Sequence, residues 1–496
     1  MLETLGLIIL LGTLIYFWSR RQHTYWARRG VPEVNKYKKF FIGHTHMHRL
    51  SDRLKFNHEV YHEHGGSSYC GLYDLHSPKL FVGDPELIRH FLVVDFDSFQ
   101  SRQSFEAVAD IDRVWSDMMS SVEGEQWKLL RSILSPTFSS GKLHGMWPLV
   151  ARNGDNLVRY CLNQKGEEID MKTTMGRYTI DTMAACAFGL DVNCIENPDE
   201  EFGVKVKAYF SFTPKRILKF FLKNLLPRFI RRGFNIGMVG NNPNIVYLKK
   251  VAEQSIKVRK EGVYRGDFLD LIIEGSKLHR DAVDEICVIS QAVMFLISGY
   301  DTTATTLAFT CWNLANNPEY QDKIREELKQ NMDAHGGYNY KSVMECKLLE
   351  AIIMETLRMY PPAFSLERKC SKDYKLPNSD LTIKKGTVCV FPIWSIHRDP
   401  KYFQDPDKFV PERMLAENKD EIQRFTHMPF GAGPRMCVAY RFAMMEVKIA
   451  LTKLLQVSQM CVVPGKEELK IAKSIAVLSL HHLPLLIKPL ENGKEK

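Results

Sequence analysis

One long, mostly apolar stretch, residues 284–316, constrains the fold of this chain more than any other segment. It begins at Asp284-Glu285, and Asn317-Pro318 ends it, so the pattern predicts a single helix over its whole length. Its middle breaks the apolar run with Ser298-Gly299-Tyr300-Asp301-Thr302-Thr303. Helix propensity and burial both disfavour these residues, and such exceptions are expected at functional positions.

A short glycine-broken loop, Phe430-Gly-Ala-Gly-Pro-Arg-Met-Cys437, precedes an amphipathic segment that begins at Phe442. Gly431 and Gly433 allow the backbone to turn and to approach a flat ligand closely. A helix that starts just after Cys437 would point its positive end at the sulfur and lower the pKa of the thiol. The ordinary alternative is a free cysteine packed as a small hydrophobic residue. The spacing favours a thiolate that holds a haem iron.

The polar break in the long helix suits the chemistry of such a site. Asp301 and Thr302 can hydrogen-bond water and relay protons to dioxygen, and Gly299 can open the helix into a groove. The alternative is a solvent-facing polar patch in which each threonine bonds back to its own helix. Together with the cysteine loop, the pattern favours the proton relay.

Composition is compatible with one large unit. The chain has 496 residues and 45% hydrophobic residues, and no linker of proline, glycine or serine divides it after residue 30. The net charge of +9 is mild, so it favours a membrane surface or an acidic partner and no nucleic acid. The eleven cysteines are scattered and indicate reduced thiols, without a disulfide framework or a zinc site.

The N-terminus resembles a membrane anchor. Residues 2–18 are almost wholly apolar, and four arginines follow: Arg20, Arg21, Arg28 and Arg29. Positive charge after the apolar segment favours a cytosolic body. A signal peptide would have the charge before it and a cleavage site after it. Because the segment is short for a span of about 20 residues, a helix lying in the membrane plane is the remaining option. Gly30 and Pro32 then separate anchor from body.

A second membrane contact is predicted between residues 208 and 234, where apolar and basic side chains alternate. An amphipathic helix packed on the protein's own core would give the same periodicity.

One group of charged residues is a candidate for a buried position. Glu355 and Arg358 lie three residues apart in an apolar helical run from Cys346 to Met359, so they can meet and need further partners, of which Arg413 is one.

The two carboxylates of haem need cationic partners. Trp127 and Arg131 lie one turn apart on a predicted helix that begins near Glu123-Gly124, and Arg435 and Arg368 would complete the clamp. Exposed surface arginine is the alternative for each. His397 is expected to have a structural or carboxylate-facing role.

These motifs resemble those of the cytochrome P450 monooxygenases. Phe430, Gly433, Arg435 and Cys437 match the cysteine-ligand signature, although Ala439 stands where the family usually has glycine. The segment 298–303 resembles the oxygen-activation motif, with Ser298 as a departure. Glu355, Arg358 and Arg413 resemble the structural triad that holds the cysteine loop, with Met414 where phenylalanine is common. The similarity extends from about Trp26 to Pro489 and is greatest to the clan of vertebrate drug-metabolising and arthropod detoxifying enzymes.

The resemblance implies a mainly α fold, the triangular helical prism of this family, with small β regions near the N-terminus and after Pro362. We expect an N-terminal signal-anchor at 1–22, a basic hinge at 23–35 and a catalytic domain at 36–496. It further implies haem b ligated by Cys437, an endoplasmic reticulum membrane location with the body on the cytosolic side, and a lid at residues 208–234.

The implied reaction inserts one oxygen atom of O2 into an apolar xenobiotic, lipid or steroid. The chain has no dinucleotide fingerprint, so electrons must come from NADPH through a reductase, with cytochrome b5 as a further donor. Lys128, Arg441, Lys448 and Lys453 are expected to form the docking face. Two other functions remain open: a haem-thiolate isomerase or dehydratase, which needs no outside electrons, and a haem sensor or carrier.

Expected pocket positions lie in the segments 104–119, 208–213, 295–303 and 362–366, and they include Phe295, Ser298, Gly299 and Phe364.

Overall fold

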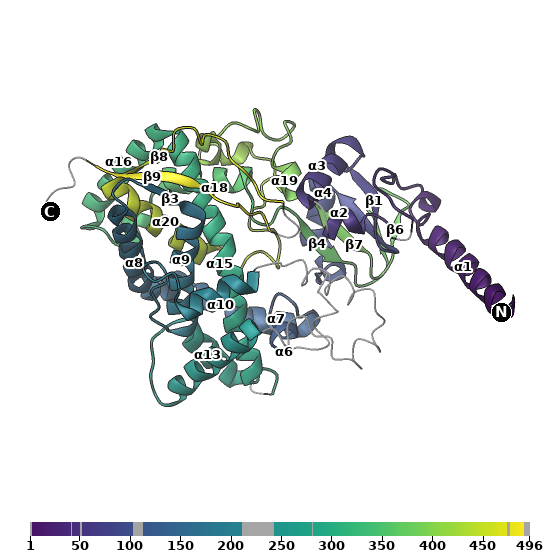
Figure 1. Cartoon of the computed structure of the whole chain (residues 1–496), viewed down its shortest axis with the longest axis horizontal. Helices are drawn as coiled ribbons and strands as arrows, with labels where there is room; N and C mark the ends of the chain where they lie inside the picture. Colours follow the sequence, from purple (N-terminus) through teal and green to yellow (C-terminus); the bar gives the residue numbers. More distant parts are fainter. Residues whose placement is uncertain are drawn as a thin grey trace.

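The computed structural model of the chain describes residues 2–40, 42–49, 52–102, 113–210, 243–279, 281–473 and 477–490. A large helical part is joined to a smaller region built around a β-sheet, from which the N-terminal helix projects (Figure 1). The helices are α1 Leu2–Gln22, α2 Thr45–Arg49, α3 Arg53–Glu63, α4 Pro85–Arg89, α6 Arg113–Ser116, α7 Gly124–Leu134, α8 Ser140–Asn163, α9 Met171–Met183, α10 Glu201–Phe210, α13 Pro243–Lys260, α14 Phe268–Ser276, α15 Glu285–Asn316, α16 Pro318–His335, α17 Tyr340–Met344, α18 Lys347–Met359, α19 Ile393–Ile396 and α20 Tyr440–Val457.

Helix α15 runs through the centre of the helical part, as the sequence predicts. The Asp284 carboxylate accepts a hydrogen bond from the Cys287 backbone N–H at 3.0 Å, which caps the first turn, and Pro318 follows the last one. Within the described residues, α15 is the one helix long and apolar enough to cross a membrane, but 61% of its apolar window is buried inside the protein. It is therefore the core helix of the fold.

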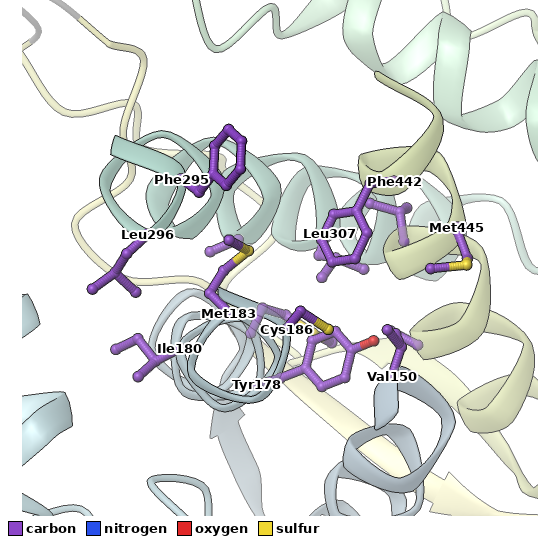
Figure 2. Packing of buried hydrophobic residues seen from close by; sticks show 14 of the residues in the cluster. Val150, Tyr178, Ile180, Met183, Cys186, Phe295, Leu296, Leu307, Phe442 and Met445 are labelled. Carbon is purple, nitrogen blue, oxygen red and sulfur yellow. The ribbon is translucent and has the colours of Figure 1, made fainter. Parts of the chain in front are cut away.

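The core of the helical part forms where α8, α9, α15 and α20 meet. Figure 2 shows side chains from these helices and from the π-helical turn after α9 in contact: Val150, Tyr178, Ile180, Met183, Cys186, Phe295, Leu296, Leu307, Phe442 and Met445. This packing fixes the position of α20, the helix that follows Cys437, relative to α15.

The smaller region is a mixed sheet of four strands in the order β1-β2-β7-β4. Its strands and those elsewhere are β1 Tyr69–Asp74, β2 Ser77–Val82, β3 Glu168–Asp170, β4 Leu366–Lys369, β5 Tyr374–Lys375, β6 Thr382–Ile383, β7 Val388–Phe391, β8 Ser458–Val462 and β9 Pro484–Pro489. Strand β2 pairs with β1 antiparallel and with β7 parallel, and β4 pairs with β7 antiparallel. The two β regions expected separately from the sequence thus join in one sheet.

The N-terminal helix α1 stands out from the body (Figure 1), and most of its apolar side chains are exposed. The segment expected as a hinge, 23–35, packs on the sheet. Trp26 is fully buried there, and its indole N–H donates to the Leu72 carbonyl at 3.1 Å. A Cβ at Gly71 would overlap the Trp26 ring, so glycine is required at that contact.

Two segments of functional interest are described only in part. Helix α10 ends at Phe210, so most of the predicted lid, 211–234, lies outside the described residues. The same holds for residues 104–112 of the predicted pocket loop, whereas Met118 and Met119 at its end are buried.

Candidate functional site

Two left-handed glycines shape the loop that leads to Cys437. Gly431 and Gly433 have φ values of 77° and 71°, a region that strongly favours glycine. A Cβ on Gly433 would overlap the carbonyl oxygen of Leu92, which lies in the turn His90–Val94. The Cys437 N–H donates to the Phe430 carbonyl at 2.9 Å and closes the loop. The turn predicted from the sequence is therefore present, and the close approach at Gly433 is to the Leu92 carbonyl.

The surroundings of the sulfur explain why alanine is accommodated two residues later. Ala439 is the N-terminal flanking residue of α20, with φ of −95°, a conformation that needs no glycine. Burial raises the pKa of the Cys437 thiol, while the Ala439 N–H, Arg102 and Arg131 act in the opposite direction. The net direction is opposite to the lowering expected from the helix end, because burial outweighs it.

Four arginines gather around the cysteine loop. The Arg131 Nη1 donates to the Met436 carbonyl at 2.9 Å, and the Arg102 Nη2 donates to the Arg435 carbonyl at 3.1 Å. Arg435 lies over the Trp127 ring, with its Cζ 4.3 Å from the ring centre, and its Nη2 donates to the Val122 carbonyl at 2.8 Å. These contacts tie α7, which carries Trp127 and Arg131, to the cysteine loop.

The arginine cluster lacks acidic partners. Burial lowers the pKa of Arg368 well below its usual value, and the charges of Arg102 and Arg435 lower it further. Burial lowers the pKa of Arg435 to about 9, with Arg102 adding to the effect and Glu123 opposing it. Among the described residues, no carboxylate forms an ion pair with any of the four arginines. The Nε atoms of Arg102, Arg368 and Arg435 are buried without a hydrogen-bond partner.

This arrangement fits the two carboxylates of a haem. Guanidinium groups removed from water without a negative partner are costly, and bidentate carboxylates are the ligands that satisfy them best. The thiol of Cys437, tied to the same loop, supplies an iron ligand beside them.

The predicted buried charge group is present and extends to a third residue. Glu355 and Arg358 are both 0% exposed, with Nε to Oε2 at 2.8 Å and Nη2 to Oε1 at 2.9 Å. The Arg413 Nε lies 3.6 Å from Glu355 Oε1, and the Val410 N–H donates to the same oxygen at 3.1 Å. The group therefore holds α18 to the segment that contains residues 397–413.

His397 connects this group to the cysteine loop. The Arg358 Nη1 donates to the His397 carbonyl at 2.8 Å, and the Met428 N–H donates to the His397 Nε2 at 2.9 Å. Because Nε2 accepts, Nδ1 carries the proton and donates to the Arg358 carbonyl at 3.1 Å. Burial, the largest cause, holds the pKa of His397 well below its usual value, so the ring is neutral. Its structural role agrees with the sequence interpretation.

On α15, Asp301 is paired with a residue that the sequence did not indicate. The Lys172 Nζ on α9 donates to Asp301 Oδ1 at 2.6 Å and to Thr305 Oγ1 at 2.7 Å. The Thr302 hydroxyl donates to the Ser298 carbonyl at 2.6 Å, which is the bond back to the helix that we named as the alternative. Its oxygen still has lone pairs that can accept a hydrogen bond.

The other predicted pocket residues have structural surroundings of their own. A Cβ on Gly299 would meet the Met183 sulfur at 2.7 Å, so its small size permits close packing of α9. Phe295 packs between Phe138 and Phe268, with ring centres 5.4 Å from each. Ser298 is exposed and Phe364 is fully buried.

The expected docking face is altered by the fold. The Lys448 side chain is 0% exposed, and its Nζ donates to the Met344 and Cys346 carbonyls and to Glu350. Lys453 is largely buried and pairs with Asp155. Both are therefore unavailable to a partner, whereas Lys128 and Arg441 remain exposed.

Sequence reasoning missed Arg102 and Lys172. Arg102 follows a bridge that joins Ser101 to Lys369, and this bridge brings it beside Arg368. No local motif marks either residue. Only the pairing of distant segments reveals them.

Comparison with known proteins identifies the family of the chain. The cytochrome P450 family model matches residues 33–489. Cytochrome P450 3A41 of Mus musculus is 34% identical over 468 residues, covering 92% of this chain and 90% of that protein. Probable cytochrome P450 6a13 of Drosophila melanogaster is 32% identical over 463 residues, covering 92% of each, and cytochrome P450 6k1 of Blattella germanica is 32% identical over 477 residues, covering 90% of each.

Proposed function

The chain belongs to the cytochrome P450 family, and we propose that Cys437 is the axial ligand of its haem iron. The observation that carries this assignment is the group of arginines around the cysteine loop, two of them buried and two half-buried, which form no ion pair among the described residues. The two haem carboxylates would be held by four arginines, Arg102, Arg131, Arg368 and Arg435. The ring of Trp127, against which the Arg435 guanidinium lies, would fix the position of Arg435.

As a member of this family, the protein is a haem-thiolate monooxygenase that obtains electrons from NADPH through a reductase. The haem, when bound, activates dioxygen for insertion of one oxygen atom into an apolar substrate. Phe430 and Gly433 give the loop its turn, and the group of Glu355, Arg358 and Arg413 holds it through His397.

On the other face of the site, Asp301 and Thr302 would handle protons. Lys172 holds one oxygen of the Asp301 carboxylate, and the second oxygen, for which the described residues provide no hydrogen-bond partner, would exchange a proton with water. The Thr302 hydroxyl oxygen would accept a hydrogen bond from that water while the hydroxyl itself donates to the Ser298 carbonyl. The two groups would thus order water without supplying a metal ligand.

A Cys437→Ser variant tests the assignment. The full chain, expressed with haem, should give a thiolate-type difference spectrum of the reduced carbon monoxide complex, and the variant should not. Turnover of an apolar substrate should require both NADPH and reductase. Product formation without either would favour an isomerase or dehydratase.

We further propose that α1 anchors the enzyme in the endoplasmic reticulum membrane with the catalytic body in the cytosol. Its apolar side chains are exposed along its length, which suits lipid and not water. Arg20, Arg21, Arg28 and Arg29 follow the apolar part and favour the cytosolic side. A chain lacking residues 2–22 should leave the membrane pellet after alkaline washing. Its retention would indicate a second membrane contact, such as the segment 208–234.

The reductase would dock on the exposed basic residues that remain near the loop, Lys128 and Arg441, with cytochrome b5 as a second donor to the same face. Lys128 pairs with Glu125 at 2.8 Å, so its charge is partly compensated. Charge reversal at both positions should slow reduction and weaken its dependence on salt. Substrates are expected to be apolar xenobiotics or lipids, and screening a panel of apolar compounds with the reconstituted enzyme would identify them.

A further inference from the structure

Helix α3 carries the sequence His58-Glu-Val-Tyr-His62, in which two histidines stand four residues apart. Residues at this spacing lie one above the other on one face of a helix. The ring centres of His58 and His62 are 4.4 Å apart, and the ring planes meet at 67°. Since zinc binds imidazole nitrogen at about 2.0–2.1 Å, two rings this close can reach one ion.

Both rings are available for a ligand. In the part of the chain that the structure describes, no hydrogen-bond partner is found for either imidazole, and the His58 Nδ1 is buried without one. Burial, the main cause, lowers the pKa of His58, which favours the neutral ring with one nitrogen that can bind a metal. His62 is exposed, so an ion can enter from solvent.

Charges of both signs act on His58: Arg398 lowers its pKa, and Asp407 and Glu59 raise it. Arg398, the nearest cation that acts on His58, lies 3.8 Å from the Asp407 carboxylate, measured from Nε to Oδ1. Its guanidinium carbon also lies 3.4 Å from the centre of the Trp394 ring, which holds it on that side. The Asp407 carboxylate therefore offsets part of the positive charge of Arg398 near the two imidazoles.

We propose that His58 and His62 bind one divalent transition-metal ion of the kind that prefers imidazole nitrogen, with Zn2+ as the example. Water would complete the coordination, because no group of three histidine, cysteine, aspartate or glutamate side chains that could hold a metal is found among the described residues. Glu59 lies 3.6 Å from the Lys36 Nζ and is directed to that partner. The pair is thus a binding site and not the centre of a metallopeptidase, although the spacing of the motif is the same.

The bound ion would brace the last turns of α3. Between the two histidines, the Tyr61 hydroxyl donates to Asp399 Oδ2 at 2.7 Å, which ties α3 to the turn after α19 (Figure 1). An ion that bridges the two rings favours the helical spacing of His58 and His62. It should therefore stabilise the folded protein in proportion to its concentration.

The experiment uses untagged holoenzyme, in which the haem occupies the thiolate of Cys437. Zn2+ binding is measured by equilibrium dialysis, together with the thermal midpoint with and without Zn2+. We expect one ion per chain and a raised midpoint. His62→Gln should weaken binding about tenfold or more, since even the loss of an outer partner costs about that much.

A matched control separates this pair from other histidines. His64→Gln removes a histidine two residues beyond the pair, which carries no ligand in this arrangement, and it should bind Zn2+ as the wild type does. The haem spectrum should stay the same in all variants, which shows that the fold is retained. Unchanged stoichiometry and affinity in a His58→Gln/His62→Gln double variant would overturn the proposal.

Discussion

Replacing Glu355 by glutamine removes one charge from a fully buried ion pair and leaves the size of the side chain almost unchanged. Of the two bonds to the carboxylate, of 2.8 and 2.9 Å, the amide oxygen can accept only one, and it carries no negative charge, while the Arg358 side chain stays 0% exposed. Breaking a buried pair in this way costs about 3–5 kcal/mol, because the remaining charge is uncompensated. At about 1.4 kcal/mol per tenfold, the ratio of folded to unfolded protein falls by at least about a hundredfold.

The same bond geometry at the surface provides the control. Arg152 and Asp191 form a pair with two bonds, of 2.9 and 3.0 Å, but their side chains are 46% and 74% exposed. Asp191→Asn should cost about 0–1 kcal/mol. The two variants therefore differ in burial and not in the number of bonds lost.

The assay measures haem per chain, the spectrum of the reduced carbon monoxide complex and the urea midpoint of each variant. Glu355→Gln should fail to retain thiolate-ligated haem, because the pair reaches the cysteine loop through His397 and Met428. We expect the same loss for Glu355→Ala and Arg358→Ala. Asp191→Asn should retain its haem. A Glu355→Gln protein with full, thiolate-ligated haem would refute the proposed role of the group.

Three further predictions test other parts of the structure. Gly433→Ala should reduce haem content, because it adds left-handed strain of about 1–2 kcal/mol and an overlap with the Leu92 carbonyl; normal loading would contradict this packing. Lys172→Met should lower the amount of product formed per NADPH consumed, because Asp301 loses its cation, and Lys172→Arg should restore most of it. If both variants form as much product per NADPH as the wild type, the Lys172–Asp301 pair has no part in proton delivery. Burial lowers the pKa of His44 to about 4, against about 6.5 in the unfolded chain. The unfolded state therefore takes up the proton first, and the free energy of unfolding should fall by up to about 3 kcal/mol between about pH 6.5 and pH 4. Urea unfolding of His44→Gln at several pH values should show that its free energy of unfolding depends less on pH than that of the wild type. An unchanged pH dependence would assign the effect to other groups.

The parts of the fold that the sequence predicted well are set by local signals. Helix α15 extends over Glu285–Asn316 because a capping aspartate precedes it and a proline follows it. Helix α18 ends at Met359 before two prolines, and α7 begins at Gly124 as expected. The turn at the two glycines of the cysteine loop could also be predicted, because a left-handed backbone strongly favours glycine.

The parts that could not be predicted depend on pairing between distant segments. Lys172 and Asp301 are 129 residues apart in the chain, and their contact follows from the packing of α9 on α15. Arg102 reaches the cysteine loop because its segment bridges to β4, and the parallel pairing of β2 with β7 joins two distant regions. No periodicity within one segment carries this information.

Burial also explains why two electrostatic expectations from the sequence failed. The sequence shows that Lys448 and Lys453 are basic and lie on the helix after Cys437, but helical periodicity does not show that α20 buries one of them completely. The same holds for the Cys437 thiol, whose pKa burial raises although a helix begins beside it. For the thiol, desolvation outweighs the nearby positive charges of Arg102 and Arg131. The arginine cluster shows the converse: two buried and two half-buried cations without acidic partners in the described residues need another group to supply negative charge. The sequence predicted three of these arginines as partners of the haem carboxylates, and their clustering with Arg102 is the strongest physical argument that this site holds a dicarboxylate cofactor.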